Sequence, residues 1–121
     1  MSAPIFGHGT GSTAAQYRQS AERDAAAPIT GNPHNQILGV LIQLGIFGAA
    51  VLASMWAAHL ALLRSPGAIA WIGTTVVLQN IVSSLFNTHL FDFFHGWPYV
   101  FGFGVIGGMV LRQAGGYRRE A

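Results

Sequence analysis

The sequence predicts an all-α integral membrane protein with about three transmembrane helices. Of its 121 residues, 51% are hydrophobic and only 8% are charged, whereas a soluble domain carries about 25% charged residues. Residues 37–63 are apolar almost without interruption, and about 20 such residues are enough to cross a bilayer. Two further apolar stretches, over residues 68–86 and 98–111, predict the other two helices.

The composition also excludes several classes of protein. All six basic residues are arginines, and they are scattered along the chain rather than gathered into the basic stripe of a nucleic-acid interface. Because the chain has no cysteine, disulfides and thiolate chemistry are excluded. Residues 1–6 have no basic start and no apolar core follows them, so we predict no signal peptide.

Residues 1–31 are polar, small and glycine-rich, and we predict a loop segment outside the membrane. Residues 14–27 are expected to form a short amphipathic helix that Pro28 ends. The glycine run at residues 7–11 lacks the preceding strand and the Gly-Lys-Ser/Thr ending of a phosphate-binding loop. We interpret this run as a tight or flexible turn, and contact with a lipid phosphate remains open.

The rest of the chain divides into a transmembrane part, residues 32–113, and a polar tail, residues 114–121. A tight turn at residues 64–67 and an aromatic loop at residues 87–97 join the predicted helices. The helices place arginines 64, 112, 118 and 119 on one side of the membrane and arginines 18 and 23 on the other. Positive residues favour the cytoplasm, so residues 1–31 and the aromatic loop are expected to face outward, to the periplasm or the cell exterior.

His34 is the most informative polar residue because it lies where the first membrane helix is predicted to begin. Asn32 suits the N-cap and Pro33 the first helical position. The helix dipole there disfavours a charged imidazole, and a neutral imidazole can act as a general base. On a continuous helix, His34 would share a face with Gly45 and Gly48, which would allow close packing against a neighbouring helix. The alternative is an interfacial histidine that binds lipid head groups.

The aromatic loop carries His89, Asp92 and His95. Steps of three residues spread these side chains over about 120° of a helix, too wide for convergence on a metal ion. We therefore predict no metal. Its aromatic residues indicate either an interfacial belt or a platform for a lipid-linked substrate, with Asp92 or His95 at the polar head.

Polar residues inside the predicted second helix, Asn80 and Ser84 among them, are expected to face the interior of a helix bundle. Hydrogen bonds between helices are the simplest role for them. His59, near the end of the first helix and close to Trp56, is interpreted as an interfacial residue.

The central stretch resembles the signature of the O-antigen ligase family. That signature is a histidine followed by Asn, Ser or Gln, then nine residues, then Gly-x-x-Gly. Here His34-Asn35 is followed by nine residues and then by Gly45-Ile46-Phe47-Gly48. The run Gly7-His8-Gly9-Thr10-Gly11-Ser12 resembles the glycine-rich run in the family's large periplasmic loop. The stretch from residue 84 to 97 and the glycine-rich last helix resemble the family's C-terminal end, so the resemblance covers nearly the whole chain.

This resemblance implies a glycosyltransferase of the bacterial inner membrane, with its active face in the periplasm. Such an enzyme moves a glycan from undecaprenyl pyrophosphate to a hydroxyl acceptor, without a metal or another cofactor. The acceptor is the lipid A core in ligases, a growing glycan in polymerases, and a serine or threonine in protein O-oligosaccharyltransferases. Family members have about a dozen membrane helices, more than the three expected here, so the chain resembles a C-terminal part that would work with N-terminal helices of the same protein.

His34 occupies the position of the family's essential histidine, which implies that it activates the acceptor hydroxyl or contacts the substrate. The substrate-binding residues expected beside it are Asn35, Arg18, Arg23, Asp92 and His95. The family's pyrophosphate-binding arginines lie mostly upstream of the matched part, and Arg18 and Arg23 lie in the loop next to His34. The alternative is a non-catalytic three-helix membrane protein whose polar residues serve packing and anchoring.

Overall fold

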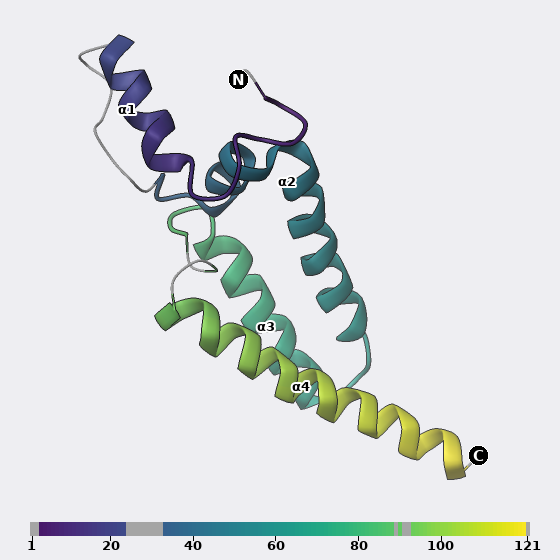
Figure 1. Ribbon diagram of the computed structural model, residues 1–121. Coiled ribbons are helices and arrows are strands. Elements are labelled where there is room, and N and C mark those ends of the chain that lie inside the picture. Colours follow the sequence, from purple (N-terminus) through teal and green to yellow (C-terminus); the bar gives the residue numbers. More distant parts are fainter. Residues whose placement is uncertain (1–2, 24–32, 89, 91–92, 121) are drawn as a thin grey trace. The chain divides into compact units, whose positions relative to one another are not determined.

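The computed structural model describes residues 3–23, 33–88, 90 and 93–120, which form helices joined by turns (Figure 1). The helices are α1 (Thr13–Arg23), α2 (Gln36–Leu62), α3 (Ala68–Ser83) and α4 (Phe93–Glu120). No strand occurs within these described ranges, which confirms the all-α prediction. By length and composition, α2 and the Phe93–Gly116 part of α4 can cross a membrane, whereas the apolar α3 is shorter.

Helix α2 begins at Gln36 rather than at Pro33. Asn35 caps it, because the Oδ1 atom of Asn35 accepts a hydrogen bond from the backbone N–H of Leu38 at 2.9 Å. His34 has a φ of +46° and therefore precedes the helix. The predicted cap, Asn32, lies outside the described residues.

Gly45 breaks α2 into two helices that follow one another along the chain. Its φ of 64° and ψ of −159° are not helical, and they fall in a region that essentially only glycine adopts. Figure 1 shows the ribbon of α2 changing direction in its first half. At 1.5 Å per residue, residues 36–44 span about 14 Å and residues 46–62 about 26 Å. Only the second part therefore has the length that a membrane crossing needs.

The ends of α3 and α4 differ from the predicted ones. Helix α3 ends at Ser83 rather than at residue 86, and residues 84–86 form a turn. Helix α4 begins at Phe93 and contains Pro98, which the sequence predicts at the helix start. A proline this near the N-terminus removes one intrahelical hydrogen bond, and the aromatic residues before it remain helical. The predicted aromatic loop is thus partly the first turn of α4.

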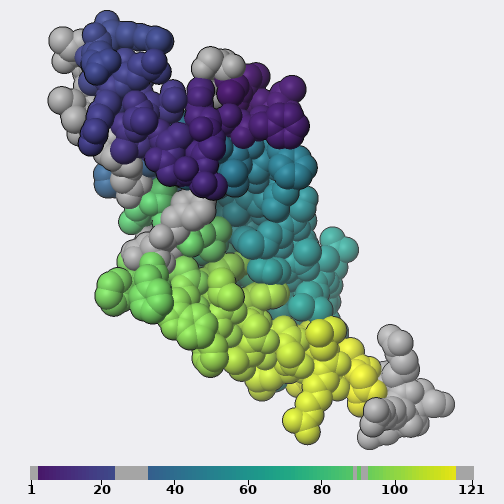
Figure 2. Space-filling view, viewed as in Figure 1, coloured from purple at the N-terminus to yellow at the C-terminus, as the bar shows by residue number. Residues whose placement is uncertain are grey.

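The chain divides into two compact units by its internal contacts. Unit 1 comprises Met1–Ala53 and Ser84–Thr88, and unit 2 comprises Ser54–Ser83 and His89–Ala121. Within unit 1, the segment before α1 lies against α2, and Figure 2 shows its purple side chains on the teal side chains of α2.

Within unit 2, α3 packs against α4. Gly73 is at the centre of this packing, since a Cβ atom there would lie 2.7 Å from both Ile106 Cγ2 and Leu63 Cδ2. Val77 is fully buried one turn further along α3. Small and branched side chains therefore bring these helices close together.

Large apolar side chains remain exposed on α3 and α4, and Trp71 is 73% exposed. Others on these helices are Ile72, Leu78, Val82, Phe93, Phe94, Trp97, Val100, Phe101, Val105, Met109 and Leu111. Soluble monomers rarely expose apolar patches of this kind, whereas lipid tails are as apolar as leucine. On α4, this surface agrees with a helix that can cross a membrane.

Candidate functional site

His34 is held in a backbone conformation that is unusual for a residue other than glycine. Its φ is +46°, in the left-handed region that costs an L-residue roughly 1–2 kcal/mol. Such strain persists only where the surrounding structure imposes it, and it clusters at functional sites. The side chain is exposed, so the imidazole is accessible at the start of α2.

Asn35 imposes this geometry through three hydrogen bonds. Its Oδ1 accepts from Leu38 N at 2.9 Å, and its Nδ2 donates to the carbonyl of Leu85 at 3.0 Å. Its own carbonyl accepts from Gly39 N at 2.9 Å. The amide that the sequence assigned to substrate therefore ties the start of α2 to the turn after α3, and Asn35 positions His34.

The helical-wheel argument for a face shared by His34, Gly45 and Gly48 is wrong, because it needs a continuous helix from His34 onward. His34 precedes α2, and Gly45 interrupts it. A Cβ atom on Gly48 would meet Leu44 Cβ and would lie 3.0 Å from Val40 Cγ1. Gly48 therefore packs against side chains on the other side of the break.

A segment before α1, residues 3–12, fills the break in α2; we call it the N-terminal brace. A helix break leaves carbonyls before it and N–H groups after it without helical partners, and buried backbone groups need such partners. The brace supplies them through these bonds: His8 N to Ile42 O (2.9 Å), Gly9 N to Gln43 O (2.9 Å), Ile46 N to Pro4 O (2.9 Å) and Phe47 N to Ile5 O (3.2 Å). Gly11 N also donates to Gln43 Oε1 at 2.7 Å.

The glycine run makes this contact possible. Gly7 has a φ of +68°, and a Cβ atom on it would collide with the backbone of Gln43 and lie 2.5 Å from Leu44 N. A Cβ atom on Gly45 would collide with the carbonyl of Ile5. The run that the sequence suggested as a simple turn thus packs closely against Gly45, and His8 and Gly9 donate hydrogen bonds to the carbonyls of Ile42 and Gln43 before it. Sequence reasoning missed this role, and the only available signal was that two glycine-rich stretches flank the histidine.

A cleft of about 500 Å³ lies within unit 1, between α1 and the first part of α2. Leu38, Leu41 and Ile42 form its apolar side. Its polar side is formed by His8, Gln16, Tyr17, Gln19, Ser20 and Arg23. Of the two arginines predicted to bind substrate, Arg23 lines the cleft, whereas Arg18 is exposed on α1. His34 is not among the described residues that line it.

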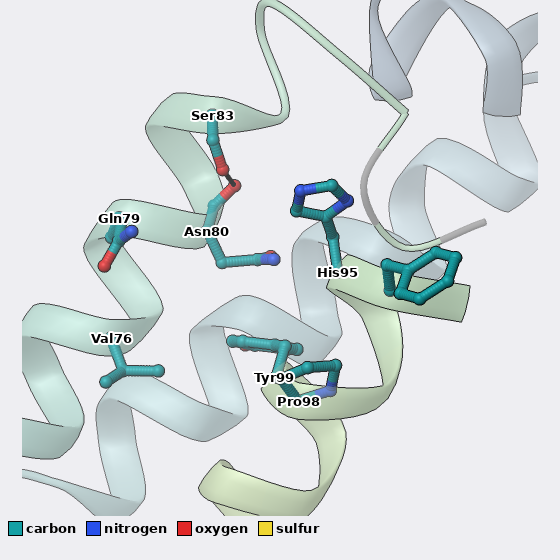
Figure 3. Close-up of a pocket in the computed structure, with 8 residues that line it drawn as sticks. Val76, Gln79, Asn80, Ser83, His95, Pro98 and Tyr99 are labelled. Atoms are coloured by element: carbon teal, nitrogen blue, oxygen red, sulfur yellow. Dashed lines mark hydrogen bonds between the residues drawn. The ribbon is translucent and has the colours of Figure 1, made fainter. Parts of the chain in front are cut away.

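A second cleft, of about 310 Å³, lies within unit 2 between α3 and α4 (Figure 3). It is lined by Val76, Gln79, Asn80 and Ser83 from α3 and by Phe94, His95, Pro98 and Tyr99 from α4. This cleft contains His95, which the sequence predicts as a substrate contact. Asp92, predicted beside it, lies outside the described residues, as does His89.

Two buried polar side chains of this second cleft, Asn80 and Tyr99, make hydrogen bonds to side chains of α2. The indole N–H of Trp56 donates to Asn80 Oδ1 at 3.1 Å. The hydroxyl of Tyr99 lies 2.8 Å from His59 Nδ1, and the His59 ring stacks on Phe103 with ring centroids 3.6 Å apart. His59 is therefore part of a packed hydrogen-bonded pair, and its predicted position at the membrane interface stays a prediction.

Comparisons of the chain with known protein families, with curated proteins and with solved structures gave no match. Its function must therefore be inferred from the sequence motif and from the contacts described above.

Proposed function

We propose that the chain is the C-terminal part of an O-antigen ligase-like membrane glycosyltransferase in which His34 is the general base. The enzyme moves a glycan from undecaprenyl pyrophosphate to a hydroxyl of the lipid A core, at the periplasmic face of the bacterial inner membrane. A growing glycan or a protein hydroxyl is the alternative acceptor. The remaining membrane helices come from the N-terminal part of the same protein.

The observation that carries this proposal is the contact between the two glycine motifs. The family resemblance pairs a glycine run with a histidine and a Gly-x-x-Gly sequence. In this chain His8 and Gly9 of the run donate hydrogen bonds to the backbone before Gly45, and Pro4 and Ile5, just before the run, accept hydrogen bonds from the backbone after it. The two motifs are therefore one structural unit, which gives a physical reason for their occurrence together.

The geometry at His34 suits a catalytic base. The residue is exposed and strained, and Asn35 fixes the backbone beside it. In the proposed step, the acceptor oxygen attacks the anomeric carbon, its proton passes to the imidazole, and the bond to pyrophosphate breaks. Because pyrophosphate is a good leaving group, the protein needs mainly to position the substrates, take the proton and balance the phosphate charge.

The cleft in unit 1 supports a lipid-linked anion as the donor. It combines the guanidinium of Arg23 with an apolar side formed by Leu38, Leu41 and Ile42. A guanidinium can bind phosphate oxygens through two parallel hydrogen bonds. The apolar side can contact the first part of an isoprenoid chain.

The test is a set of chromosomal variants at His34. His34→Ala should abolish long-chain lipopolysaccharide and cause lipid-linked glycan to accumulate, while the amount of membrane protein is unchanged. His34→Asn is the matched control for backbone geometry, since asparagine tolerates a positive φ but has no basic nitrogen. If the role of His34 were purely conformational, His34→Asn would retain transfer, and that result would contradict the proposal.

A further inference from the structure

We propose that the cleft between α3 and α4 in unit 2 binds a neutral sugar ring. This inference does not depend on the chemistry assigned to His34, because it concerns a separate set of residues. It rests on the Asn80 amide that faces the cleft, on the aromatic wall beside it, and on the absence of charge among the described lining residues.

Asn80 supplies the first argument, since it is only 6% exposed. An indole N–H can only donate, so the bond from Trp56 assigns the carbonyl oxygen of Asn80 to that contact. The amide nitrogen is left on the side of the cleft, and Figure 3 shows the amide directed into it. An amide nitrogen that faces the cleft can donate a hydrogen bond, and a ligand oxygen in the cleft can accept it.

Tyr99 supplies the second argument, and it too is only 6% exposed. Its hydroxyl is held by His59, and its ring reaches from α4 across the cleft beneath Asn80 in the view of Figure 3. Pro98 lies beside it, and Phe94 also lines the cleft. The cleft thus has an apolar wall, of which Tyr99 is buried, beside the Asn80 amide, and this suits the C–H face of a sugar ring.

The polar groups at the rim match hydroxyls rather than ions. Ser83 donates to the carbonyl of Asn80 at 3.2 Å, so its oxygen can still accept a hydrogen bond. The imidazole of His95 points from the first turn of α4 towards the side of α3 that carries Asn80 and Ser83 (Figure 3). Amide and hydroxyl groups donate and accept, as sugar hydroxyls do.

The charge and the volume of the cleft restrict the class of ligand further. None of the eight described lining residues is arginine, lysine, aspartate or glutamate, so the cleft lacks the charged partner that a phosphate or an ammonium group needs. A volume of about 310 Å³ lies at the low end of the roughly 300–1,000 Å³ of small-molecule sites. The cleft therefore fits one ring rather than a long glycan.

The experiment is saturation-transfer-difference NMR on the full chain in lipid nanodiscs, with glucose, N-acetylglucosamine and glucose 1-phosphate as probes. Val76→Phe places a large ring into the cleft without touching its hydrogen bonds. Val82→Phe adds the same ring on α3 at a position that is exposed and outside the cleft. Circular dichroism checks that both variants keep their helices.

We expect signals from at least one of the neutral sugars, weakened at least tenfold by Val76→Phe and unchanged by Val82→Phe. If a short isoprenyl-linked sugar displaces the bound sugar, the cleft binds a sugar ring of the glycan donor. If a core oligosaccharide displaces it, the cleft binds a sugar ring of the acceptor. The proposal is overturned if no neutral sugar gives a signal, if Val76→Phe and Val82→Phe behave alike, or if glucose 1-phosphate binds more tightly than glucose. A failure of transfer in His34 variants would leave these results unaffected, so the two proposals are tested separately.

Discussion

Gly7 and Gly45 lie far apart in the sequence, yet a Cβ atom added to Gly45 would lie 2.7 Å from the backbone nitrogen of Gly7. Both residues have a positive φ, 68° at Gly7 and 64° at Gly45. Their contact lets the N-terminal brace (residues 3–12) satisfy the backbone groups that the break in α2 exposes. The break would otherwise leave unpaired groups in an apolar helix, which a membrane does not tolerate.

Gly45→Ala should destabilise the protein by at least about 2 kcal/mol, because an alanine would adopt a glycine-only conformation and collide with the brace. Chemical denaturation in mixed micelles measures this change. Gly104→Ala is the matched control, since a Cβ atom on this helical glycine has no neighbour within 4 Å. It should be neutral or stabilising, and an equal loss in both variants would contradict the role assigned to Gly45.

Gly7→Ala should also destabilise the protein, but its effect should not add to that of Gly45→Ala. Each substitution separates the brace from α2, so the second change has little left to remove. A double-mutant cycle over the two positions measures how far the combined loss of unfolding free energy falls below the sum of the two single losses. Strict additivity would mean that the two glycines act independently.

Asn35→Ala should cost about 1–2 kcal/mol, since it removes a helix cap and the bond to the Leu85 carbonyl. Asn35→Asp retains an oxygen for Leu38 N and loses only the donor to Leu85. It should therefore be the milder of the two changes in the same denaturation assay. If Asn35→Ala leaves stability unchanged and weakens only substrate binding, Asn35 contacts substrate directly rather than positioning His34.

Trp56→Phe should destabilise unit 2 by about 1–3 kcal/mol, because it leaves the oxygen of Asn80 buried without its donor. Adding Asn80→Leu should recover part of this loss, because the unpaired group is then gone. Trp71→Phe is the control, as Trp71 is largely exposed. Equal effects of the two tryptophan substitutions would contradict a structural role for the Trp56–Asn80 bond.

The proposed orientation predicts opposite labelling of two serines, since the chain contains no cysteine that would interfere. Ser20→Cys on α1 should react with a membrane-impermeant maleimide added outside spheroplasts. Ser65→Cys, in the turn between α2 and α3, should react only after the membrane is permeabilised. The reverse pattern would place His34 on the cytoplasmic side and remove the basis for periplasmic transfer.

The apolar stretches of the sequence predict the helices because their length and composition are local properties. The break at Gly45 is not predictable in this way, since a glycine in an apolar helix is equally typical of close helix packing. Its conformation depends on the brace around Gly7, a distant partner. The choice of Asn35 rather than Asn32 as the cap likewise depends on the turn at Leu85.

The candidate site was predictable only in part, for the same reason. His34 was proposed from its motif and its place before an apolar helix, and its role stays a prediction. The cleft between α3 and α4 required knowledge of how these helices pack, and the sequence did not pair His59 with Tyr99 or Trp56 with Asn80. The sequence shows where the polar residues lie along the chain, but it does not show which residues they contact in the fold.

The central claim is that His34 takes the proton of the acceptor hydroxyl. The most direct measurement is the rate of glycan transfer by purified His34→Asn enzyme in nanodiscs, with lipid-linked donor and acceptor at saturating concentrations. A general base contributes typically 10²–10⁴-fold, so we predict that kcat falls by at least about a hundredfold while the free energy of unfolding is unchanged. A variant that transfers glycan at the wild-type rate would contradict the claim.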